Sequence, residues 1–207
     1  MRRRPLLRPL ALAAVVLGLL ATGCDYTGSI GPRVALTGDS IMDNGRPRIV
    51  AKLQPDHRVT ILTAPAAPIW DLRGIVQLQR NSNPNVMVLQ VGSPDVEFAA
   101  ESPYGFVVSQ KMRELMDITR GVPCVVWVNI KENGVSPYYT PQWQAQATRL
   151  NDFAAALAAN RPWVRIVDWA ALGASRRDWF QADGLHLTEL GRAALASHID
   201  AAVRACS

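Results

Sequence analysis

"VALTGDSIM", residues 34–42, places a short apolar run directly before Gly-Asp-Ser. Apolar residues that end at a glycine are typical of a buried strand followed by a turn. Ser40 then has two interpretations. Together with Asp39 it is an ordinary residue for capping the helix that follows, or its hydroxyl is a nucleophile held at the carboxyl edge of a sheet. The choice depends on which other residues reach that edge.

The chain has 207 residues, enough for one α/β domain with a substantial core. Its composition, 49% hydrophobic and 19% charged, is typical of a folded globular protein. The formal net charge of +5 depends on four arginines among the first eight residues. Without them, 18 basic side chains stand against 17 acidic ones, so we expect no surface for nucleic acid.

The N-terminus has the pattern of a signal peptide over residues 1–23. "MRRRPLLR" is a basic start, and the apolar segment "LALAAVVLGLLA" that follows has 12 residues. That is short of the roughly 20 residues needed to span a bilayer. "ATGC" ends at Cys24 and resembles a bacterial lipoprotein cleavage site, at which Cys24 becomes the lipidated first residue. An ordinary signal peptidase site would cut the same bond. Both interpretations predict export to the cell envelope, with or without a lipid anchor outside the cytoplasmic membrane.

The other two cysteines are Cys124 and Cys206. In an oxidising compartment they are a plausible disulfide pair, and the alternative is two unpaired thiols. The predicted last helix ends near Cys206, at the sheet edge where the predicted fourth strand begins near Cys124. No Cys-x-x-Cys pair or histidine cluster is present, so we expect neither a metal nor another cofactor.

After a tether over residues 24–32, apolar runs alternate with helical patterns across residues 33–207. The predicted strands are Val34–Thr37, Val59–Leu62, Val86–Val91, Val125–Ile130 and Val164–Asp168. The predicted helices are Pro47–Leu53, Ile69–Gln79, Ser109–Thr119, Pro141–Ala159 and Thr188–Ala205. Five such units predict a three-layer α/β/α sandwich around a five-stranded parallel sheet. In such a fold, ligands bind beyond the carboxyl ends of the strands.

"DGLHLT", residues 183–188, precedes the last predicted helix. A short Asp-x-x-His turn lets a carboxylate and an imidazole lie side by side. Asp183 would then fix the tautomer of His186 and leave its other ring nitrogen to take a proton from Ser40. A serine hydroxyl is a poor nucleophile without such a base. Each residue alone has an ordinary structural explanation, but their combination in this fold predicts a catalytic triad.

These two blocks, "GDSIM" and "DGLHLT", resemble the first and last motifs of the SGNH hydrolases, also called GDSL-type esterases. The resemblance extends from about Arg33 to the end of the chain. It implies a flavodoxin-like sandwich and an esterase, lipase, thioesterase or acyltransferase activity. It also implies that Ser40 is the nucleophile, His186 the general base and Asp183 its orienting carboxylate. The backbone N–H of Ser40 would help to bind the oxyanion.

The middle motifs depart from this family. Its members usually place a glycine, whose N–H binds the oxyanion, after the second strand. Here the segment reads "TAPAAPIW", residues 63–70, and Ala66 or Ala67 replaces the glycine. An alanine still has an N–H, so the donor survives if the backbone angle permits.

The third motif, usually Gly-x-Asn-Asp, reads "GSPD" from Gly92 to Asp95. Pro94 replaces the asparagine and offers neither an N–H nor a polar side chain. Loss of one oxyanion donor typically lowers kcat by roughly 10²–10³-fold. Ser93 and Asn129 are the candidate replacements for this donor.

The sequence therefore predicts an exported serine esterase that forms an acyl-enzyme on Ser40. Its substrate would be a small-molecule, lipid or glycan ester, and membrane contact would come only through an anchor at Cys24. Transfer of the acyl group to another hydroxyl is the variant of this chemistry that the sequence leaves open. The alternative from another class is an envelope binding protein that has lost efficient catalysis through Pro94.

Overall fold

A computed structural model describes residues 24–26, 31–96, 104–133 and 139–206. Its strands are β1 (Cys24–Tyr26), β2 (Arg33–Gly38), β3 (Arg58–Thr63), β4 (Val86–Gln90), β5 (Cys124–Val128) and β6 (Val164–Val167). They form one sheet in the order β1-β3-β2-β4-β5-β6. Strands β2 to β6 are all parallel, which confirms the predicted five-stranded sheet.

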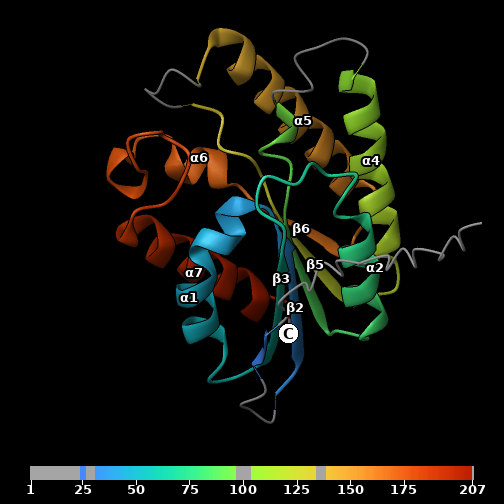
Figure 1. Cartoon of the computed structure of the whole chain (residues 1–207). Helices are drawn as coiled ribbons and strands as arrows, with labels where there is room; N and C mark the ends of the chain where they lie inside the picture. Colours follow the sequence, from blue (N-terminus) through green and yellow to red (C-terminus); the bar gives the residue numbers. More distant parts are fainter. Residues whose placement is uncertain (1–23, 27–30, 97–103, 134–138, 207) are drawn as a thin grey trace, which may run out of the picture.

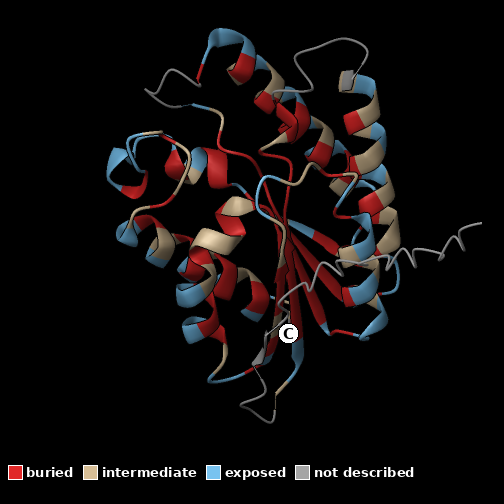
Figure 2. Cartoon of the chain, viewed as in Figure 1, coloured by how far each residue is buried: buried red, intermediate tan, exposed pale blue. Residues whose placement is uncertain are grey.

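Helices cover both faces of this sheet. They are α1 (Ser40–Leu53), α2 (Arg73–Asn81), α4 (Tyr104–Ile118), α5 (Pro141–Ala159), α6 (Trp169–Gly173) and α7 (Glu189–Arg204), with a 3₁₀ turn η1 (Arg177–Trp179). In Figure 1, α1, α6 and α7 lie on one side of the sheet and α2, α4 and α5 on the other. Figure 2 shows the buried strands enclosed between these two layers. The predicted α/β/α sandwich is therefore confirmed.

Each face of the sheet carries its own hydrophobic core. Along β2, Val34 and Leu36 belong to the core shared with α1 and α7, whereas Ala35 belongs to the core shared with α2, α4 and α5. This alternation follows from the two-residue repeat of a strand. Because both faces are buried, the strands read as continuous apolar runs.

Three predicted helix starts were wrong. Helix α1 begins at Ser40 rather than at Pro47, which lies inside it and leaves out one backbone hydrogen bond. A proline suits a first turn, so its position misled the prediction, whereas the true start is the Asp39 cap. Helix α2 begins at Arg73 rather than at Ile69, and α4 begins at Tyr104 rather than at Ser109.

The sixth strand, β1, was not predicted. It lies within the segment 24–32 that the sequence indicates as a tether, and it pairs antiparallel with β3. Three residues are too few for a periodic pattern, so only the pairing reveals this strand. The predicted signal peptide, residues 1–23, lies outside the described residues. Among those described, no helix combines the length and the apolar character needed to cross a bilayer.

A disulfide joins Cys124, the first residue of β5, to Cys206, just past the end of α7. Their Cα atoms are 5.8 Å apart, within the usual range for a bridge. This confirms the predicted pair and excludes the alternative of two unpaired thiols. The bridge lies at the amino-terminal edge of β5, away from the edge where the strands end.

The strand order also determines where a site can form. The chain leaves β2 for β3 on one side and later returns to β4 on the other side, which makes the end of β2 a topological switch point. Loops that leave such a point in opposite directions open a crevice at the carboxyl edge. Ser40 lies two residues after the end of β2, at this position.

Candidate active site

The turn after β2 is tightly built around Gly38. A Cβ at this position would lie 2.2 Å from the Met42 Cβ and 2.7 Å from the Gln90 carbonyl oxygen, so only glycine fits. Asp39 follows with an extended backbone and caps α1, its carboxylate accepting from the Ile41 N–H at 2.9 Å. Ser40 is therefore held on the first residue of the helix.

Hydrogen bonds at the start of α1 leave one donor free. The N–H groups of Ile41 and Asp43 donate to the side chain and carbonyl of Asp39, and the Met42 N–H donates to Gln90 Oε1 at 2.9 Å. Within the described residues the Ser40 N–H makes no hydrogen bond. It is thus available beside its own hydroxyl, at the positive end of the helix dipole.

Ser40, His186 and Asp183 form a continuous hydrogen-bonded chain. The Ser40 Oγ lies 3.1 Å from His186 Nε2, and His186 Nδ1 lies 2.7 Å from Asp183 Oδ2. Both distances are within hydrogen-bonding range. With a proton on Nδ1 donated to Asp183, Nε2 is left to accept the Ser40 proton.

The Asp-x-x-His turn is fixed from several sides. Asp183 accepts from the N–H groups of Leu185 and His186, each at 2.9 Å. Burial acts to raise the pKa of Asp183, but these N–H groups and the His186 ring outweigh burial and leave that pKa below its usual value. The Leu187 N–H donates to Asn44 Oδ1 at 2.9 Å, and the Tyr139 hydroxyl donates to the Gly184 carbonyl at 3.0 Å.

Ala66 and Ala67 lie in the turn that follows β3, beside the turn that carries Ser40. Ala66 has a φ of 59°, in the left-handed region that favours glycine. Its N–H makes no hydrogen bond within the described part of the chain, whereas the Ala67 N–H donates to the Ala64 carbonyl. Ala66 is thus the residue with both the glycine-like backbone and the free donor.

Gly92 and Ser93 follow β4 at the same edge. Gly92 has a φ of 108° and is buried. The Ser93 N–H donates to Asp39 Oδ2 at 3.1 Å, and the Ser93 Oγ lies 3.4 Å from Gln90 Nε2. Ser93 thus connects the loop after β4 to the turn that carries Ser40, and its N–H is not free to bind an oxyanion.

Asn129 follows β5 but is engaged elsewhere. Its Nδ2 donates to Asp168 Oδ1 at 2.9 Å, and its Oδ1 accepts from the Ala170 N–H at 2.9 Å. The side chain is buried, with 7% exposed. Asn129 therefore connects β5 to the start of α6 rather than joining Ser40 and His186.

Two buried carboxylates lie near the turn that carries Ser40. Asp39 and Asp95 are both fully buried, and burial raises the pKa of each. The pKa of Asp95 reaches about 7, partly because the nearby Asp39 charge opposes its ionisation. Both Asp95 oxygens accept from the Ile69 N–H, at 3.0 Å each. These groups hold loops together and do not contact the Ser40 hydroxyl.

Sequence reasoning missed three supporting residues. Gln90 ends the otherwise apolar strand β4 and binds both the α1 start and the loop after β4. Asn44 lies one helical turn after Ser40, on the same face of α1. No sequence pattern around Tyr139 indicated that its hydroxyl would support the Asp183 turn. The sequence did contain two clues: a polar residue at the end of a buried strand, and an asparagine four residues after Ser40.

The assembled groups suit acyl transfer. A hydroxyl, a base oriented by a carboxylate, and free N–H donors on adjacent turns are the components of nucleophilic catalysis on an ester. No cluster of three or more His, Cys, Asp or Glu side chains that could hold a metal occurs in the described residues.

Comparison with known proteins gives a structural result only. No family model matches the sequence, and no similar curated protein was found. Among solved structures, the catalytic domain of the Streptococcus pneumoniae peptidoglycan O-acetyltransferase OatA superposes with a TM-score of 0.67 and 16% identity, over 86% of this chain and 96% of that one. The Geobacillus stearothermophilus acetylxylan esterase Axe2 gives 0.67 and 14%, over 87% and 95%.

TesA superposes with a TM-score of 0.64 and 17% identity, over 84% of this chain and 99% of that one. At such low identity the similarity establishes the fold. The chain has the α/β SGNH hydrolase fold of these proteins, as the two end motifs predicted.

Proposed function

We propose that this protein is a serine esterase that cleaves a carboxylic ester through an acyl-enzyme on Ser40. The observation that carries the proposal is the hydrogen-bonded chain from Ser40 through His186 to Asp183. A structural role does not require this chain, because capping of α1 is already provided by Asp39. Solved structures of the same fold include esterases and an acetyltransferase, which supports acyl chemistry.

In the proposed mechanism, the Ser40 Oγ attacks the ester carbonyl while His186 Nε2 accepts the Ser40 proton. Asp183 stabilises the imidazolium that forms. The N–H groups of Ser40 and Ala66 bind the oxyanion. The third donor usual in the family, an asparagine side chain, is missing because Pro94 stands in its place. His186 then returns the proton to the leaving alcohol, and a water activated by His186 releases the acid.

Transfer to a second hydroxyl would follow the same steps, with an alcohol in place of that water. The OatA domain is described as a peptidoglycan O-acetyltransferase and Axe2 as an acetylxylan esterase, so both outcomes occur on this fold. Adding a soluble alcohol during turnover and identifying the products separates them. A new ester would indicate transfer, and free acid alone would indicate hydrolysis.

Export to the cell envelope is part of the proposal. The basic and apolar N-terminus and Cys24 support it, as does the Cys124–Cys206 bridge, because such bridges persist in oxidising compartments. Labelling cells with a fatty-acid probe tests the lipid anchor. Incorporation that is lost in Cys24→Ala would support lipidation, whereas an unlabelled exported protein would indicate ordinary secretion.

The central test uses the purified mature chain, a fluorophosphonate and short p-nitrophenyl esters. We expect covalent labelling and ester turnover in the wild type and neither in Ser40→Ala. Ser197→Ala is the matched control, because Ser197 is an exposed serine on α7. Equal activity in Ser40→Ala would remove Ser40 from the mechanism. A folded wild type that is not labelled by the fluorophosphonate and does not hydrolyse the esters would favour the alternative of a binding protein. Pro94 is the residue that suggests this alternative.

A further inference from the structure

A small cavity adjoins the Asp-x-x-His turn. Its volume is about 190 Å³, which is below the 300–1,000 Å³ of sites that enclose drug-sized ligands, so it suits one part of a substrate. The cavity lies between the loop after β5, the α6–η1 segment and the turn that carries Asp183. It is lined by Lys131, Asn133, Gly173, Ala174, Arg177, Phe180, Gln181 and Gly184.

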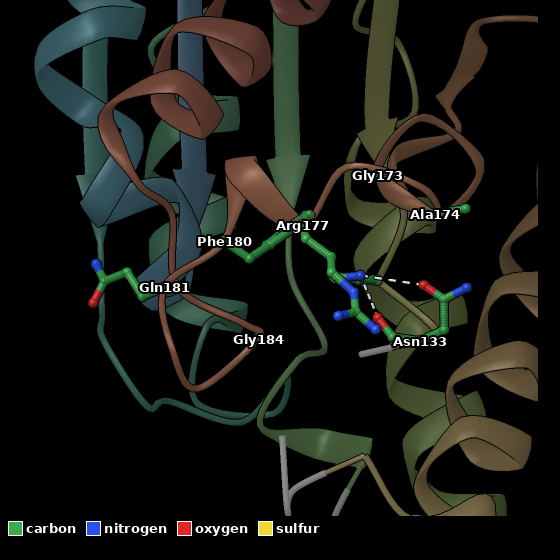
Figure 3. A pocket seen from close by; sticks show the side chains of 8 residues that line it. Asn133, Gly173, Ala174, Arg177, Phe180, Gln181 and Gly184 are labelled. Carbon is green, nitrogen blue, oxygen red and sulfur yellow. Dashed lines mark hydrogen bonds between the residues drawn. The ribbon is translucent and has the colours of Figure 1, made fainter. Parts of the chain in front are cut away.

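Two of the described lining residues are cationic, and none of them is acidic. Figure 3 shows the Arg177 side chain extending from the segment beside Phe180 toward Asn133, and Gly184 on the turn at the same opening. Gly184 directly follows Asp183 and is two residues before His186. The cavity is thus continuous with the turn that holds the proposed base.

Lys131 is buried, and among the described residues no carboxylate pairs with it. Only 6% of the residue is exposed, and its Nζ donates to the Asn133 carbonyl and to Asn133 Oδ1. The ammonium also lies 4.2 Å from the centre of the Phe180 ring and 5.6 Å from that of Tyr139. Burial lowers the pKa of Lys131 to about 8, as expected where no anion offsets the cost of desolvation.

Arg177 likewise has no partner in the part of the chain that the structure describes. It is exposed, and within the described residues its guanidinium forms no ion pair or hydrogen bond. Its neighbour Arg176 is different, because that guanidinium binds Asp178 at 2.7 Å and lies 4.4 Å from the Trp179 ring. Asp178 is therefore already occupied, and the nearby Glu132 accepts from Thr148 and Asn151.

We propose that this cavity is an anion subsite that seats a carboxylate or phosphate of the ester substrate between Lys131 and Arg177. The substrate class would be acylated acidic compounds, such as acetylated uronic acids or sugar phosphates. Arg177 supplies the planar donor pair that both groups accept, and Lys131 supplies a charge in a dry site where it acts strongly. The Phe180 ring forms the apolar wall of the subsite.

The first test rests on the proposed esterase function. Three acetyl esters at the same ring position are compared: methyl glucoside, methyl glucuronoside and methyl glucoside 6-phosphate. We expect kcat/KM for at least one anionic ester to exceed that of the neutral one by about 10- to 100-fold, the range of charge-assisted hydrogen bonds. The anionic ester with the higher kcat/KM shows whether the subsite binds a carboxylate or a phosphate. Equal rates for all three would overturn the subsite.

Variants attribute the preference to the cavity. In Arg177→Gln and Lys131→Met the ratio of anionic to neutral kcat/KM should fall toward one, and taking a ratio within each variant cancels any general loss. Arg176→Gln is the matched control and should keep the wild-type ratio, because Arg176 does not line the cavity. A ratio preserved in both cavity variants would contradict the proposal.

A second test does not depend on catalysis. Binding of methyl glucuronoside, methyl glucoside and methyl glucoside 6-phosphate to Ser40→Ala is measured by NMR at low and high salt. We expect anion binding that weakens with salt and disappears when Arg177→Gln is added. If this binding occurs while no ester is hydrolysed, the subsite stands and the esterase proposal fails. If the esters are hydrolysed but the anions neither bind nor raise the rate, the esterase proposal stands and the subsite fails.

Discussion

Breaking the Cys124–Cys206 bridge should cost this protein a large part of its stability. The two cysteines are 82 residues apart in sequence, and the chain-entropy relation for a loop of that length gives about 4.5 kcal/mol at 25 °C. Domains of this kind are stable by only about 5–15 kcal/mol in total. The effect arises mainly in the unfolded chain, which gains freedom when the loop opens.

Cys206→Ala is the sharper variant for this test. Cys206 is half-buried at the end of α7, so truncating it leaves little cavity, whereas Cys124 is buried in the core and its truncation adds a packing cost. Reduced wild type offers the same comparison with no change of side chain. Guanidinium unfolding, followed by tryptophan fluorescence and circular dichroism, measures the free energy of each form.

We expect Cys206→Ala and reduced wild type to lose similar amounts, near 4.5 kcal/mol, and to unfold with a larger m-value because their unfolded chains are more open. Ester turnover by the folded reduced protein should remain, since the bridge lies at the edge opposite Ser40. A loss below about 1 kcal/mol in both forms would refute the loop-entropy reasoning.

Asp183→Asn should lower kcat by about 10⁴-fold with little change in fold, because the amide favours the wrong His186 tautomer; steady-state kinetics and circular dichroism check this. Pro94→Asn should raise kcat by up to about 10²-fold if the family's third oxyanion donor is missing, and an unchanged kcat would mean that another group supplies it. Asp95 holds its proton to about pH 7 in the native state, whereas the unfolded chain releases it near pH 4, so this group lowers stability as the pH rises between those values. The free energy of unfolding of Asp95→Asn should therefore gain about 3 kcal/mol on that of the wild type from pH 4 to pH 7, and parallel curves would contradict the raised pKa.

Much of the fold was readable from the sequence because parallel strands are buried on both faces. The apolar runs around Leu36, Val88 and Val126 stood out from their polar neighbours for that reason. Helix starts were less readable. The cap at Asp39 resembles any Asp-Ser pair, and only its hydrogen bonds identify it as the start of α1.

The candidate site likewise has a part that could be predicted from the sequence and a part that could not. Ser40, Asp183 and His186 could be chosen from sequence because residue type and position in a βα unit restrict the chemistry. The sequence also named candidate oxyanion donors, but it could not tell which of them is free, because that depends on hydrogen bonds formed in the folded chain. The Asn129 side chain is suitable but is hydrogen-bonded to Asp168 and Ala170, whereas Ala66 has no polar side chain and its N–H makes no hydrogen bond within the described part of the chain.

The order of residues along this chain determined a five-stranded α/β/α domain and three reactive groups at one edge, because periodicity and strand ends are local properties. Only folding decided what residues far apart in sequence do together: the 3.1 Å contact from Ser40 to His186, and the placement of Lys131 and Arg177 around one cavity with no carboxylate partner in the described part of the chain. Such contacts depend on which loops pack together. The packing is selected by the sum of many contacts in the core, so no short segment determines it.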